Sequence, residues 1–140
     1  MKQNSLGVII ARRRLCWPGK EGNKITVLIG KPRPFPESKR FPHRDYYCPY
    51  QIVGVGDQKT RYAAGVDAVQ ALQLVITAIG IDLQLINKRR SSPLRWLVED
   101  QVLEGHDYFN NCGFPETPQG IRAATIGRRF KKKCFCSGNR

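Results

Sequence analysis

The strongest pattern in the chain is a helical repeat of apolar residues that begins after Gly65. Apolar side chains recur at steps of three and four, which places them on one face of an α-helix: Val66, Val69, Leu72, Ile76, Ile79, Leu83 and Ile86. Asp67 stands where an N-cap accepts a backbone hydrogen bond, and Gln70 occupies the third position of a capping box. Lys88 closes the repeat, where positive charge suits the helix dipole. We expect one long amphipathic helix over residues 67–88.

Shorter period-two patterns predict strands in the first 65 residues. Apolar and other residues alternate over residues 25–29, and β-branched residues run from 6 to 15 into three arginines that must alternate between the two faces of a strand. At least one of these arginines is therefore expected to point where its interaction partners matter. Residues 19–23 are expected to form the turn between these strands. Two further strands are predicted at residues 46–55 and 59–63, with a glycine-rich turn between them.

These elements predict an α+β fold, with a three- to four-stranded antiparallel sheet packed against one long amphipathic helix. Pro49 cannot donate to a ladder, so its strand is expected at an edge or at a bulge. The proline-rich connection at residues 31–44 is not expected to be regular. After Pro93 the pattern fits a short helix or a strand over residues 94–98 equally well. Residues 106–115 predict a loop that packs on the core through Tyr108, Phe109 and Phe114.

The distribution of charge divides the chain into two segments. The 140 residues include 24 Lys and Arg against 11 Asp and Glu, a formal net charge of +13. Residues 116–140 carry a net charge of +6, nearly half of the excess, and contain few apolar side chains. We expect a compact α+β domain over residues 1–115 and a basic tail or arm over residues 116–140. The hydrophobic content of 41% suffices for one core.

The apolar segments do not predict export or membrane insertion. The run at residues 6–11 is too short for a secretory signal and is followed at once by three arginines. Polar residues interrupt the stretch at 69–86, so no transmembrane segment is expected. An odd number of cysteines without regular spacing fits a reducing compartment, and a cytoplasmic location is expected. They are Cys16, Cys48, Cys112, Cys134 and Cys136.

Candidate catalytic and metal-binding groups lack a supporting pattern. His106, Cys112, Cys134 and Cys136 offer four ligands, but the last two are closer together than paired zinc ligands. His43, Asp45 and Cys48 lie within six residues of one another without matching a known catalytic spacing. The glycine-rich turn at residues 54–57 is not followed closely by a helix that would complete a phosphate site. We expect no catalytic residue, no metal and no cofactor, and the sequence leans away from an enzyme.

Basic runs make binding the favoured class of function. The first hypothesis is a non-catalytic protein-interaction module, accessory or immunity-like, with an unidentified and acidic protein partner. The alternative is binding to DNA or RNA, supported by the aromatic residues Phe130 and Phe135 among the tail lysines. No nucleic-acid reader motif is present. Both hypotheses use the same candidates: Arg12, Arg13, Arg14, Lys88, Arg89, Arg90, Arg128, Arg129, Lys131, Lys132 and Lys133.

Five short segments together carry a resemblance to a known family. They are GVDAVQALQL at residues 65–74, IARR at 10–13, IGKP at 29–32, CPYQI at 48–52 and GFP at 113–115. As a set they resemble a family of small, uncharacterised bacterial proteins catalogued as a domain of unknown function, over about residues 6–115. The resemblance implies a compact bacterial α+β domain and supplies no catalytic residue. The basic insertion around Lys39 and Arg40 and the tail beyond Pro115 depart from the family pattern.

Overall fold

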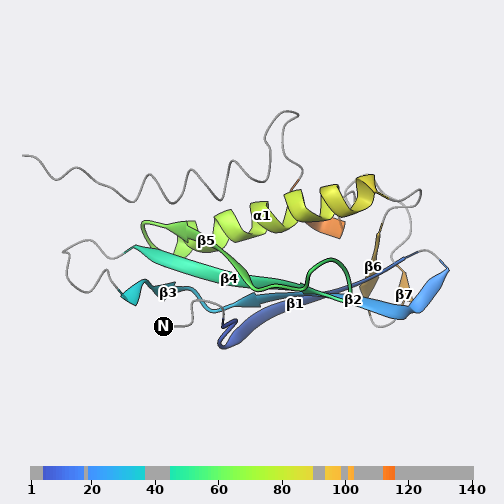
Figure 1. Ribbon diagram of the computed structural model, residues 1–140, viewed down its shortest axis with the longest axis horizontal. Coiled ribbons are helices and arrows are strands. Elements are labelled where there is room, and N and C mark those ends of the chain that lie inside the picture. Colours follow the sequence, from blue (N-terminus) through green and yellow to red (C-terminus); the bar gives the residue numbers. More distant parts are fainter. Residues whose placement is uncertain are drawn as a thin grey trace, which may run out of the picture.

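The chain folds as one helix on an antiparallel sheet. The computed structural model describes residues 5–17, 19–36, 45–89, 94–98, 101–102 and 112–115. Figure 1 shows α1 along one face of the sheet, with no described helix on the other face. The α+β prediction is confirmed. The elements are β1 (Ile9–Trp17), β2 (Lys20–Gly30), β3 (Arg33–Pro34), β4 (Tyr46–Val53), β5 (Arg61–Gly65), α1 (Ala68–Lys88), β6 (Arg95–Val98) and β7 (Gln101–Val102).

The sheet is larger than predicted. Six described strands follow the order β3-β4-β2-β1-β6-β7, and β5 pairs with β4. The expectation of three to four strands was too low because β3 and β7 have two residues each, too few to show alternation. The ambiguous segment after Pro93 forms the strand β6 rather than a helix.

Pro49 lies inside the sheet, so of the two predicted positions, an edge or a bulge, the edge is excluded. Tyr50 pairs with Ile29 of β2 and also with Arg61 of β5, which places β4 between these two strands. The ladder from β4 to β2 ends at Tyr50, and the ladder to β3 begins at Tyr47. Pro49 falls in the gap between the two ladders. An internal strand tolerates this proline because its missing donor coincides with that gap.

The β1–β2 connection is tighter than the predicted turn over residues 19–23. Trp17 pairs with Lys20, so β2 begins at Lys20 and residues 20–23 are extended. Gly19 adopts a φ of +73°, which glycine tolerates without strain and which lets so short a connection reverse the chain.

The helix begins at the predicted N-cap. The residues that it buries against the sheet are rotated about the helix axis relative to the predicted apolar stripe. Asp67 Oδ1 accepts a hydrogen bond from Gln70 N at 2.7 Å, which confirms the N-cap. Gln70 Oε1 accepts from Val66 N, one residue before the capping-box position. Val66 and Val69 are each 65% exposed, whereas the buried helix residues are Ala71, Val75, Ile79, Gly80, Ile81 and Leu83.

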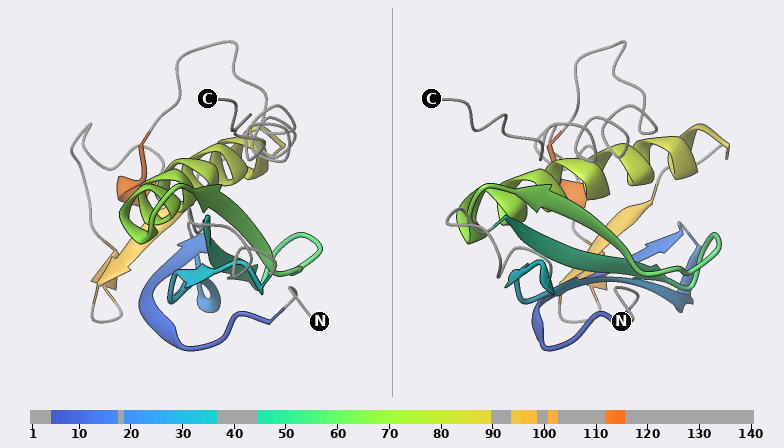
Figure 2. Two further views of the ribbon diagram at one scale, coloured as in Figure 1. Left: turned by 90° about the vertical axis from the view of Figure 1, so that its left-hand side faces the viewer. Right: turned by 60° about the vertical axis from the view of Figure 1, so that its left-hand side comes forward.

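Helix α1 packs on β4 and β5, as both views of Figure 2 show. The core between helix and sheet joins Val75, Ile79 and Leu83 to Val27 and Ile52. Phe114 is buried against this core, as predicted, while Tyr108 and Phe109 lie outside the described residues. By length and composition α1 is apolar enough to cross a membrane, a property it shares with core helices.

Candidate functional site

Strand β1 divides its side chains between the two faces of the sheet. Leu15 is fully buried beneath α1, and Arg13 lies on the same face because strand residues alternate. Arg12 and Arg14 therefore point to the opposite face, and both are exposed. We call the side of the sheet opposite α1 the open face.

Register brings further cations to the open face. Residues directly opposite in an antiparallel pair project to the same side. Cys16 pairs with Lys24 of β2 and with Arg95 of β6, and it alternates in phase with Arg12 and Arg14. Both Lys24 and Arg95 are exposed. Three adjacent strands thus place four basic residues on the open face: Arg12, Arg14, Lys24 and Arg95.

Aliphatic side chains lie among these cations. Leu28 pairs with Arg12, and Ile9 pairs with Gly30, two residues further along β2, so both project to the open face. Val53 pairs with Thr26, the partner of Arg14, and projects to the same side. The open face therefore combines guanidinium groups with a patch of branched apolar surface.

Ion pairs do not compensate every cation of the open face within the described part of the chain. Arg12 and Arg95 form no ion pair with another described residue. Three described carboxylates are engaged elsewhere: Asp67 at the helix cap, and Asp57 and Asp82 in the β4–β5 region. A surface of one sign attracts a partner of the opposite sign.

Arg13 is held by the fold itself. Its guanidinium carbon lies 3.9 Å from the Trp96 ring centroid and 4.8 Å from that of Phe114, and Nη1 donates to the Cys112 carbonyl oxygen at 2.9 Å. Burial lowers the pKa of Arg13, with the neighbouring Cys112 opposing the shift. We call these residues the Arg13 cluster. The three arginines alternate between the two faces of β1 as predicted, and Arg13 is the one that contacts partners within the fold.

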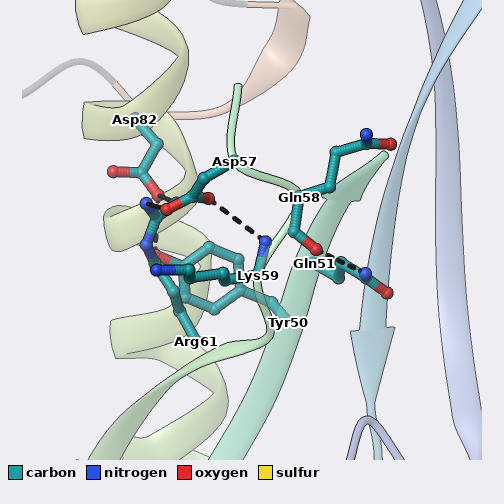
Figure 3. A network of polar contacts seen from close by, with 7 residues as sticks. All are labelled: Tyr50, Gln51, Asp57, Gln58, Lys59, Arg61 and Asp82. Carbon is teal, nitrogen blue, oxygen red and sulfur yellow. Dashed lines mark hydrogen bonds and ion pairs between the residues drawn. The ribbon is translucent and has the colours of Figure 1, made fainter. Parts of the chain in front are cut away.

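A second polar group joins the helix to the β4–β5 hairpin (Figure 3). Tyr50 Oη donates to Asp82 Oδ2 at 2.7 Å. Arg61 approaches Asp82 Oδ2 at 3.5 Å and Asp57 Oδ2 at 3.0 Å, so one guanidinium lies between two carboxylates. Asp57 Oδ1 also accepts from Lys59 N, which shapes the predicted hairpin turn. We call this group the Tyr50–Asp82 network.

Burial is the main cause of the pKa shifts of Tyr50 and Asp82 in this network. Burial raises the pKa of Tyr50, and the charge of Asp82 raises it further, so the hydroxyl remains a donor. Burial also raises the pKa of Asp82, against the opposing effects of the Tyr50 hydrogen bond and the Arg61 charge. These contacts fasten the hairpin to α1, and we assign the network a structural role.

Cys48 and Cys112 are buried thiols that donate hydrogen bonds to backbone carbonyl groups. Cys48 Sγ donates to the Gly30 carbonyl oxygen, and Cys112 Sγ donates to that of Leu94. Burial raises the pKa of Cys48 to about 11 and that of Cys112 to about 12. Both groups are thiols at neutral pH, whereas nucleophiles and metal ligands are thiolates. His43, His106, Cys134 and Cys136 lie outside the described residues.

The candidate binding residues separate into groups. Arg12 and Arg14 lie together on the open face, whereas Arg13 is in its cluster on the α1 side of the sheet. Lys88 and Arg89 lie at the C-terminal end of α1, in the helical layer. The rest of the candidates fall outside the described residues: Arg90, Arg128, Arg129, Lys131, Lys132 and Lys133.

Sequence reasoning missed Lys24 and Arg95. Neither belongs to a basic run, and Arg95 follows a segment whose secondary structure was ambiguous. The signal that locates them is the strand register, because both are opposite Cys16. Only the pairing of β1 with both neighbours brings them beside the arginines at positions 12 and 14.

Fold and site together define an α+β protein with one helix on one face of an antiparallel sheet and a cationic open face. A family model described as a domain of unknown function (DUF6968) matches residues 11–105. The chain belongs to this family. No curated protein and no solved structure matched the chain in the corresponding searches.

Proposed function

We propose that the protein is a binding module that recognises an acidic protein partner through the open face. The observation that carries this proposal is the convergence of Arg12, Arg14, Lys24 and Arg95 from three adjacent strands. Strand alternation and register hold these cations on one side of a rigid sheet. Electrostatic complementarity on such a surface accelerates association and selects among partners.

The apolar composition of the open face favours a protein over a nucleic acid. Protein interfaces combine arginine with an apolar centre, as Arg12 and Arg14 do with Ile9 and Leu28. Single-stranded nucleic acids instead require aromatic rings with free faces. The described rings of Phe35, Tyr47 and Tyr62, at the β3–β4–β5 end of the sheet, pack against one another, with centroids 4.9 to 5.9 Å apart.

Affinity capture from the native cell tests the proposal. Three tagged chains are compared after nuclease treatment: wild type, Arg12→Glu/Arg95→Glu, and the matched control Lys59→Glu/Lys88→Glu, whose two lysines are exposed outside the open face. Circular dichroism confirms that each chain is folded. We expect one protein to be retained by wild type and control, and to be lost from the open-face variant.

Two outcomes of this capture would contradict the proposal. Equal retention by all three chains would show that the open face does not bind the partner. Loss of the captured material on nuclease treatment, with a gel shift of RNA or DNA by the purified chain, would assign the cations to phosphates. In that case affinity would fall steeply with salt because condensed counterions are released.

A further inference from the structure

The first half of β1 has one side along which no described strand pairs with it. Strand β2 pairs with β1 from Ile9 to Trp17, whereas β6 pairs with β1 only from Arg14 to Cys16 among the described residues. Residues 9–13 of β1 therefore have a side that no described strand occupies. We call this segment the open edge. Backbone donors and acceptors along such an edge form a template for another strand.

The side chains at the open edge are unusually apolar for an exposed strand. Val8 is 69% exposed, Ile9 is 40% exposed and Ile10 is 47% exposed. A β-bulge between Ile9 and Ala11 places two residues of β1 opposite one step of β2. A bulge leaves its extra residue out of the ladder and increases the twist. The apolar side chains are therefore displayed at the edge rather than packed beneath α1.

We propose that the open edge binds an extended acidic segment of a partner protein as an added antiparallel strand. This proposal rests on the proposed function and specifies how the partner binds. Backbone hydrogen bonds to residues 9–13 provide attachment, and side-chain contacts provide selectivity. Apolar residues of the added strand contact Ile9 and Ile10, and its carboxylates lie opposite Arg12 and beside Arg14. The bulge restricts regular pairing to a short segment.

A second copy of this chain fits the same edge poorly. Two chains paired antiparallel about Ile10 would place Arg12 of each chain opposite Val8 of the other, so no carboxylate would face the arginines. Each chain also carries a formal net charge of +13, which opposes association of two copies. Charged residues also protect natural edges from self-pairing. The arginines thus oppose self-association and favour an acidic strand.

Fluorescence anisotropy with synthetic peptides tests the strand addition. The probe is a labelled nine-residue peptide of alternating Glu and Val, compared with one in which Lys replaces Glu. A third peptide keeps the Glu–Val side chains but carries N-methyl groups on two adjacent central amides, which block hydrogen bonding along both edges. We expect binding of the first peptide and at least about tenfold weaker binding of the other two. Equal binding of the methylated peptide would overturn the strand addition.

Protein variants locate the binding at the open edge. The chain Ile9→Ser/Ile10→Ser is compared with Val66→Ser/Val69→Ser, which alters two exposed apolar residues at the start of the helix. We expect the first pair alone to weaken peptide binding by about tenfold, since it removes apolar contact without changing charge. Equal weakening by both pairs would overturn the assignment to this edge.

The outcomes separate this inference from the proposed function. Capture that depends on Arg12 and Arg95, combined with binding of the methylated peptide, would retain the open face and exclude strand addition. Equal capture of the partner by the wild type and by Arg12→Glu/Arg95→Glu would exclude the proposed function itself. Sedimentation of the chain alone should show a monomer. A dimer that Ile9→Ser/Ile10→Ser abolishes would assign the edge to a second copy and overturn the acidic partner.

Discussion

Neighbouring arginines in one run have different physical roles because a strand alternates its side chains. Arg13 stacks on Trp96 and Phe114 and donates to Cys112, while Arg12 is exposed on the open face. A desolvated cation–π contact contributes up to about 2 kcal/mol, and a hydrogen bond from a charged donor about 1.5–3 kcal/mol. The Arg13 cluster therefore connects residues 112–115 to the sheet.

Replacing Arg13 should reduce stability far more than replacing its neighbour. We expect Arg13→Ala to lower the free energy of unfolding by about 1–3 kcal/mol, because both the ring stacking and the hydrogen bond are lost. Arg12→Ala should change it by less than about 0.5 kcal/mol, as is usual for surface residues. Urea unfolding of the two variants measures the contrast. Equal effects would contradict the role of the Arg13 cluster.

Asp82 should make stability depend on pH in the direction set by burial. Its pKa is raised in the folded protein, so the folded state binds the proton more tightly than the unfolded state. The wild-type chain therefore loses stability as pH rises between the unfolded and folded pKa values, whereas Asp82→Asn has no such titration. We expect the free energy of unfolding of Asp82→Asn to rise relative to that of the wild type as the pH increases from about 4 to about 7.

Urea unfolding of both chains at several pH values checks this expectation. The asparagine Oδ1 can still accept from Tyr50 Oη, so the comparison isolates the charge of residue 82. Tyr50→Phe serves as a control that removes the hydroxyl but keeps the carboxylate. If the wild-type chain instead gained stability relative to Asp82→Asn as the pH increased, the raised pKa assigned to Asp82 would be contradicted.

Helix α1 faces the sheet with Val75, Ile79 and Leu83, and not with the start of the predicted stripe. Ile79 is fully buried, whereas Val69 is 65% exposed. We expect Ile79→Ala to cost about 2–5 kcal/mol because it leaves a cavity, and Val69→Ala to cost less than about 0.5 kcal/mol. Thermal or urea unfolding measures both. Similar costs at the two positions would contradict the observed rotation of the helix.

The junction between β5 and α1 depends on the absence of a side chain at Gly65. A Cβ placed there would lie 2.5 Å from Ala71 N and 2.9 Å from the Gln70 carbonyl carbon, both rigid backbone atoms of the first helical turn. We expect Gly65→Ala to cost about 1–3 kcal/mol through overpacking.

Gly22→Ala is the matched control for Gly65→Ala. Nothing lies within 4 Å of a Cβ built at Gly22. Its unfolding midpoint in urea should equal that of the wild type or exceed it slightly, because alanine restricts the unfolded chain. An unchanged midpoint for Gly65→Ala would contradict the close approach of α1 to β5.

Sequence patterns predicted the long elements and missed features that depend on pairing. The alternation at residues 25–29 and the cap at Asp67 are local signals, and both correspond to observed structure. The internal position of Pro49 depends on a gap between two ladders, which no local pattern reports. The cations Lys24 and Arg95 become neighbours only through the register with Cys16. Half of the candidate site was therefore invisible before strand pairing was known.

In the whole molecule, α1 packs on one face of the sheet, and the proposed binding surface lies on the opposite face. The core lies between α1 and the sheet. The opposite side carries Arg12, Arg14, Lys24 and Arg95 around aliphatic residues. The formal net charge of +13 adds long-range attraction for an acidic partner. The central claim is that this partner binds the sheet and not the helical layer.

Amide hydrogen exchange of the chain, alone and with the captured partner, tests that claim most directly. We expect slower exchange of β1 and β2 amides on binding, concentrated at residues 9–14. Exchange in the hairpin at residues 54–60 and in the last turn of α1 should be unchanged. Protection confined to the hairpin or to α1, with β1 unchanged, would contradict it.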